Sequence, residues 1–88
     1  MGIRFDEERT HTVDRAVHCF RAYVDGQVVR CGVTEEAFFF GFNVPHELIP
    51  MPETFEKYRD SIQRAARRII EEGRFEPDGS VLVRDRDV

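Results

Sequence analysis

The feature that most constrains the fold is the dipeptide Asp25-Gly26, which separates two runs of β-forming residues. Residues 16–24 are rich in Val, Phe and Tyr, and residues 27–33 are rich in Val. A type I′ turn needs positive φ at both of its central residues, and Asp and Gly tolerate that conformation. The sequence therefore predicts a β-hairpin with a two-residue turn, which also fixes the register of its strands.

This register distributes the hairpin residues over two faces. His18, Phe20 and Ala22 share the more apolar face, which we expect to lie against the core. On the other face Arg21 lies opposite Arg30, and like charges in that position are destabilising unless water or an acid screens them. We therefore expect this second face to be at least partly solvated.

The two cysteines and His18 suggest a nucleophile or a metal site, but the hairpin register argues against both. Neighbouring residues of a strand point to opposite faces, so His18 and Cys19 are not expected to share a site. Cys19 and Cys31 also fall on opposite faces, and zinc usually needs at least three convergent protein ligands. We expect no catalytic residue, no metal and no cofactor here, and two reduced structural thiols with His18 as a partly covered sheet residue.

Residues 53–72 show helical spacing of apolar side chains, and the helix they predict has recognisable ends. Pro52 suits the first helical position and Gly73 suits the C-terminal stop. The apolar stripe is formed by Phe55, Tyr58, Ile62, Ala65, Ala66, Ile69 and Ile70. The pattern is typical of one long amphipathic helix packed on a sheet.

The remaining segments complete an α+β expectation for a single domain over residues 1–88. Thr34 is expected to cap a short helix that ends near Gly41, and a proline-containing loop follows at 43–52. Residues 6–15 read as a loop, with one helical turn as an alternative. Residues 80–84 read as a final strand, and residues 3–5 as a further short one. We expect an antiparallel sheet of three to four strands packed against the long helix.

Composition and net charge limit the classes of partner that this chain is expected to bind. The chain is 41% hydrophobic and 34% charged, which is typical of a globular domain. A net charge of −4 does not favour nucleic acid as a partner. The helix has basic residues, but acids alternate with them, so we expect a solvated face with ion pairs and keep weak nucleic-acid contact as the alternative. With no long apolar run and no secretory signal, we expect a soluble cytoplasmic protein without a membrane span.

The order of these segments resembles a small bacterial family catalogued as domain of unknown function 1488. The resemblance lies in Ile3-Arg4-Phe5-Asp6, in the hairpin with Val24-Asp25-Gly26 and Arg30-Cys31, in Thr34-Glu35-Glu36-Ala37-Phe38, in Phe55 with Tyr58-Arg59, and in Asp78-Gly79 with Val81-Leu82-Val83. The chain has Tyr58 where that family has His, and it lacks a Pro before Asp6. The resemblance implies an α+β fold of cytosolic type and no assigned activity.

Arg59 is the one charged residue that falls inside the apolar stripe of the predicted helix. Such a side chain must reach water, pair with an acid or bind an anion. The two interpretations that remain are a structural ion pair and a ligand-binding contact to an anion.

Phe38, Phe39, Phe40 and Phe42 are the last conspicuous feature. Three consecutive aromatic residues on a helix span too wide an arc for one packed face. Either the loop from Pro45 to Pro52 covers them or some form an interaction surface, for self-association or for another protein. We therefore expect a non-enzymatic binding or accessory module, and keep as the alternative an anionic-ligand or enzymatic role between the long helix and the hairpin.

Overall fold

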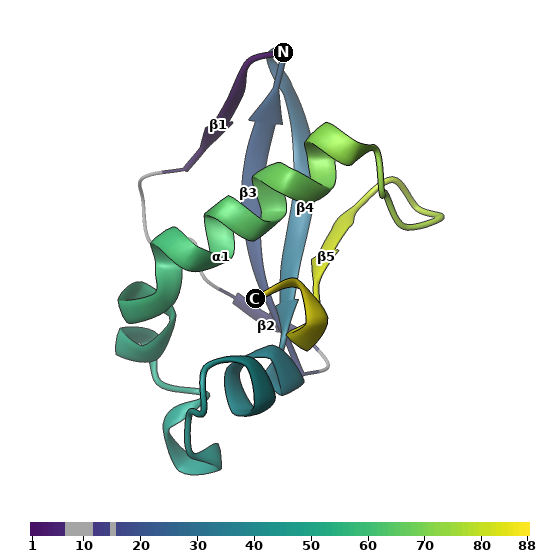
Figure 1. Ribbon diagram of the computed structural model, residues 1–88. Coiled ribbons are helices and arrows are strands. Elements are labelled where there is room, and N and C mark those ends of the chain that lie inside the picture. Colours follow the sequence, from purple (N-terminus) through teal and green to yellow (C-terminus); the bar gives the residue numbers. More distant parts are fainter. Residues whose placement is uncertain (7–11, 15) are drawn as a thin grey trace.

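The computed structural model describes residues 1–6, 12–14 and 16–88, with the backbone alone for 12–14. One long helix, α1 (Pro52–Glu72), crosses a sheet formed by β1 (Ile3–Phe5), β2 (Thr12–Asp14), β3 (Val17–Val24), β4 (Gln27–Thr34) and β5 (Val81–Val83) (Figure 1). Three short helical turns, η1 (Ala37–Gly41), η2 (His46–Leu48) and η3 (Asp85–Asp87), complete the described chain. The expected α+β fold class is confirmed.

The hairpin of β3 and β4 is the centre of the sheet. Asp25 and Gly26 both have positive φ, 50° and 86°, as the type I′ turn requires. Val24 pairs with Gln27 next to this turn, and Phe20 pairs with Cys31 further along the strands. The predicted register is therefore confirmed.

The sheet is four strands wide in the order β1-β3-β4-β5, and β2 pairs with the other end of β3. β1 and β2 are antiparallel to β3, whereas β5 is parallel to β4. The expectation of a purely antiparallel sheet is thus wrong. After β4, helix α1 carries the chain back along the sheet, so β5 can run in the same direction as β4 (Figure 1). Its three residues pair with residues 31–33, in the second half of β4.

The expected loop at residues 6–15 contains a strand that the sequence did not reveal. Residues 12–14 form β2, which is too short and too polar to show an alternating pattern. Residues 7–11 and 15 lie outside the described part of the chain, so the expectation of a loop or a helical turn there is not tested.

The ends of α1 follow the expected chemistry. Pro52 is its first residue, and Gly73 adopts the left-handed conformation with φ of 71°. The N–H groups of Gly73 and Arg74 donate to the carbonyls of Ile70 and Ile69 and close the last turn. The buried side chains of α1 are Phe55, Ile62, Ala65, Ala66, Ile69 and Ile70. They face the inward side chains of the sheet, which include Phe20, Ala22, Cys31, Val33, Val81 and Val83.

The short helix after β4 has a different form from the one expected. Thr34 caps it, because its Oγ1 accepts a hydrogen bond of 3.2 Å from the N–H of Ala37. Beyond that point the chain forms a wide π-helical turn, in which the N–H of Phe42 donates to the carbonyl of Ala37. Gly41 lies so close to Val88 that a Cβ at this position would overlap the valine side chain. The C-terminal turn η3 therefore packs directly on η1.

We predict that Ala66→Leu lowers the free energy of unfolding by about 1–3 kcal/mol, because Ala66 is fully buried where α1 lies on the sheet. The measurement is urea denaturation followed by circular dichroism. Glu71→Leu, at an exposed position of the same helix, should change the stability by no more than about 0.5 kcal/mol. Equal effects of the two substitutions would contradict the packing described here.

Candidate binding surface on the open face of the sheet

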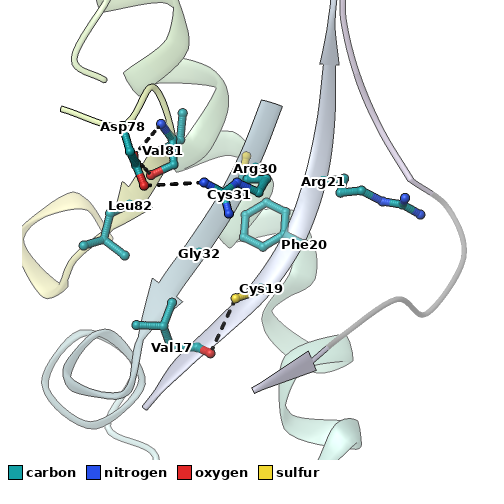
Figure 2. Close-up of a pocket in the computed structure, with 11 residues that line it drawn as sticks. Val17, Cys19, Phe20, Arg21, Arg30, Cys31, Gly32, Asp78, Val81 and Leu82 are labelled. Atoms are coloured by element: carbon teal, nitrogen blue, oxygen red, sulfur yellow. Dashed lines mark hydrogen bonds and ion pairs between the residues drawn. The ribbon is translucent and has the colours of Figure 1, made fainter. Parts of the chain in front are cut away.

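The face of the sheet opposite α1 carries a hollow of about 450 Å³ (Figure 2). Its apolar part is formed by Val17, Cys19, Gly32 and Leu82, which come from β3, β4 and β5. A Cβ at Gly32 would lie 2.5 Å from Cγ1 of Val17 and 3.5 Å from Cδ1 of Leu82. Glycine at this position therefore allows the side chains of Val17 and Leu82 to approach the backbone of β4 where three strands meet.

A row of charged side chains borders this hollow. Arg21 and Arg30 lie directly opposite each other on β3 and β4, as the register predicts. Nε of Arg21 lies 2.9 Å from Oδ2 of Asp6, and Nη2 of Arg30 lies 3.6 Å from Oδ2 of Asp78. Each arginine is thus paired with a carboxylate of its own, which reduces the repulsion between the two. Both arginines are also solvated.

The two ion pairs differ in how firmly they are held. Asp78 accepts hydrogen bonds of 2.6 Å and 2.9 Å from the hydroxyl and the N–H of Ser80. These bonds, more than the nearby Arg30, hold the pKa of Asp78 below its ordinary value. The side chain of Arg30 is 76% exposed and meets Asp78 only at the longer distance. Such an exposed pair contributes about 0–1 kcal/mol, so Arg30 can exchange it for an incoming carboxylate.

As the register predicts, Cys19 lies on the opposite face of the sheet from His18 and Cys31. Cys31 is buried on the α1 side, whereas Cys19 is half-buried in the hollow and its Sγ donates to the carbonyl of Val17 at 3.8 Å. Burial raises the pKa of the Cys31 thiol to about 12, so it stays protonated. Among residues 1–6 and 16–88, no three His, Cys, Asp or Glu side chains gather as a metal site would require.

His18 is more deeply buried than the sequence indicated. Its side chain is fully buried, whereas we expected partial cover. Its ring contacts the edge of Phe38, with centroids 5.0 Å apart, and Nε2 lies 3.8 Å from Oε2 of Glu35. The turn η1 folds over this end of β3 and supplies Phe38, which strand periodicity alone does not predict.

Arg59 lies at the contact between α1 and the N-terminal strand. It donates to the backbone carbonyl of Asp6, and its Nη1 lies 3.6 Å from Oε2 of Glu56. Arg67 donates to the carbonyl of Ile3 at 3.3 Å. Arg59 and Arg67 are eight residues apart, which is a rise of about 12 Å along the helix. The extended chain from Ile3 to Asp6 covers about 10 Å, a similar length. The two arginines therefore contact the two ends of β1. The ligand-binding role of Arg59 stays a prediction.

The four phenylalanines have different environments. Phe38 is fully buried, whereas Phe40 is 65% exposed. Phe39 stacks on His46 with centroids 4.1 Å apart, and Phe42 stacks on Tyr58 at 4.4 Å. The loop expected to cover the aromatic cluster therefore contacts Phe39. An interaction surface in this region also stays a prediction, and it would be centred on Phe40, because a fully buried Phe38 has no surface to offer.

Comparison with known proteins places the fold in a family. The family model described as "Protein of unknown function (DUF1488)" matches residues 3–83. The chain belongs to this family. A crystal structure of a DUF1488 protein of unknown function from Shewanella loihica PV-4 is similar to it, with a TM-score of 0.77 and 24% identity over 92% of this chain and 90% of that one. No curated protein matches the chain.

In the part of the DUF1488 chain that the structure describes, α1 is the one long helix, and it is amphipathic. None of the helices in the described ranges is long and apolar enough to cross a membrane.

The hollow itself was not predicted from the sequence. The opposed Arg21 and Arg30 were a sequence signal for it, but Asp78, Ser80 and Leu82 reach this face only through the parallel placement of β5.

We predict that Phe38→Ala lowers the free energy of unfolding by about 3–5 kcal/mol, as for other fully buried phenylalanines. Phe40→Ala should cost less than about 1 kcal/mol, because its ring is mostly exposed. Urea denaturation of the two variants measures this difference. Similar losses for both would show that Phe40 belongs to the core in solution.

The pKa of Cys31 predicts a loss of stability at high pH. The unfolded thiol ionises near its ordinary pKa of 9.0, while the folded thiol remains protonated to about 12. Between these values the unfolded state binds fewer protons, so the contribution of Cys31 falls by up to about 1.4 kcal/mol per pH unit. Urea denaturation at increasing pH should show a shallower decline for Cys31→Ala than for the unsubstituted protein. Identical declines would contradict the burial of this thiol.

Proposed function

We propose that this protein is a non-enzymatic binding module that acts by contact with another protein surface. The observation that carries the proposal is the apolar hollow on the open face of the sheet, bordered by Arg21 and Arg30. Hollows of this size, apolar with a few charged groups at the edge, are typical of binding sites. The partner surface would offer an apolar side chain for the hollow and a carboxylate for the two arginines.

Electrostatics support this choice of partner. Arg21 and Arg30 are paired across β3 and β4, but their guanidinium groups point apart, to Asp6 at 2.9 Å and to Asp78 at 3.6 Å (Figure 2). The side chain of Arg30 is 76% exposed, so an additional carboxylate from a partner can approach it and would be attracted. A basic segment would be repelled, so the hollow discriminates by charge as well as by shape.

The alternative of a ligand pocket between α1 and the hairpin has little room in this fold. The side chains there pack against each other as the core, with Ala22, Val33, Ile62 and Ala66 each fully buried. Of the two thiols that line the hollow, Cys19 donates to a backbone carbonyl and Cys31 stays protonated because it is buried, so neither is an activated nucleophile.

We also propose a cytoplasmic location, in which neither nucleic acid nor membrane is the partner. The two cysteines point to opposite faces of the sheet and do not pair, as is usual for thiols in a reducing compartment. The net charge of −4 disfavours nucleic acid as a partner.

The proposal can be tested with three synthetic fluorescent peptides of equal length, in which Leu alternates with Glu, Lys or Ser. Fluorescence anisotropy should show that the Leu–Glu peptide binds at least about tenfold more tightly than the Leu–Lys peptide, because close charge pairs across an interface have effects of this size. Chemical-shift changes in a ¹⁵N-labelled sample should map to Cys19, Gly32 and Leu82.

Two exposed arginines provide a matched pair of variants. Arg30→Glu should weaken binding of the Leu–Glu peptide by about tenfold or more. Arg64→Glu makes the same charge change on α1 and should leave binding nearly unchanged. Equal binding of all three peptides, or shift changes confined to α1, would show that the open face is not the binding surface.

A further inference from the structure

The turn η1 presents the most exposed aromatic side chain of the described residues. Phe40 is 65% exposed, and its ring meets that of Phe39 edge to face at 4.9 Å. Phe39 in turn stacks on His46, with centroids 4.1 Å apart and planes 19° from parallel. These three rings, here called the Phe40 patch, hold each other in place, and a pre-positioned aromatic ring is the usual anchor of a protein interface.

The sequence around the Phe40 patch is acidic. Residues 35–56 contain no Lys or Arg, and their charged residues at neutral pH are Glu35, Glu36, Glu47, Glu53 and Glu56. Glu36 and Glu47 are exposed. Glu36 precedes Phe40 by four residues on the same helical segment, and Glu47 follows His46 directly. The chain thus carries an exposed phenylalanine with carboxylates close to it.

The hollow on the open face has the complementary properties. Its apolar part lies beside Arg21 and Arg30, and β3 and β4 themselves contain no Asp or Glu. The one acid among its lining residues is Asp78, whose contact with the exposed Arg30 is 3.6 Å long. We propose that the partner of this hollow is a second copy of the same chain, which inserts Phe40 and brings Glu36 or Glu47 to the arginines. This inference rests on the proposed binding function of the hollow.

The two surfaces share no residue, so one molecule can use both at once. Such a contact is heterologous, and unless it closes into a ring it joins molecules head to tail. A single aromatic anchor buries much less area than a permanent interface, so the association should be weak, with a dissociation constant on the order of 0.1 mM. Because the contact includes charge pairs at its edge, high salt should weaken it.

Analytical ultracentrifugation of the full chain tests this arrangement. Between about 0.05 and 1 mM protein the average mass should rise with concentration, as expected for an association of this strength. Phe40→Ser and Arg30→Glu should each abolish the rise, and both positions are exposed enough for the variants to fold. Arg64→Glu, outside both surfaces, should associate like the unsubstituted chain.

Mixing the two variants gives the sharper result. Phe40→Ser keeps its hollow and Arg30→Glu keeps its Phe40 patch, so a 1:1 mixture retains one intact contact per pair. The mixture should form a heterodimer, although neither variant associates alone. A mixture that stays monomeric, or an unsubstituted chain that stays monomeric over the whole concentration range, would overturn the inference.

The peptide experiment separates failure of this inference from failure of the proposed function. If the Leu–Glu peptide binds in the hollow but the chain remains monomeric, the binding function stands and the partner is a different protein. If neither the peptide nor a second copy binds, both proposals are wrong. Self-association that survives both Phe40→Ser and Arg30→Glu would place the contact elsewhere and also overturn the inference.

Discussion

The structure depends on the register that the Asp25-Gly26 turn imposes on β3 and β4. A two-residue turn leaves no freedom in the pairing, and a slip of one residue would move every side chain to the other face. With this register, Phe20 and Ala22 contact α1 while Cys19 and Arg21 face away. The core and the candidate binding surface are therefore two consequences of the same constraint.

The candidate binding surface depends on which face of the sheet α1 covers. One long helix covers one face of the sheet, and the short turns η1 and η3 pack on each other beside it (Figure 1). Within residues 1–6, 12–14 and 16–88 no helix covers the other face, and its apolar residues gather where β3, β4 and β5 meet. Gly32 allows Val17 and Leu82 to come close to the backbone there, and Arg21 and Arg30 border the hollow.

Several features were predictable because they depend on local chemistry. The turn needs positive φ, α1 begins with Pro52 and ends before Gly73, and the spacing of its apolar residues matches its buried face. The separation of His18 from Cys19 followed from strand geometry alone.

Other features depended on contacts with residues that are distant in the sequence. Phe38 and Phe40 are two residues apart in the same turn, yet one is buried against His18 and the other is exposed. Arg59 donates to the carbonyl of Asp6, which directly follows β1 and is 53 residues away in the sequence.

The sequence by itself determined the α+β class, the hairpin register and the long helix, because turn conformation, helix ends and side-chain periodicity are properties of neighbouring residues. Only the tertiary structure decided that β5 lies parallel to β4, that β2 extends the edge of the sheet, and that Asp78, Ser80 and Leu82 complete a hollow beside Arg30. These arrangements depend on where α1 returns the chain to the sheet, and local pattern does not specify that position.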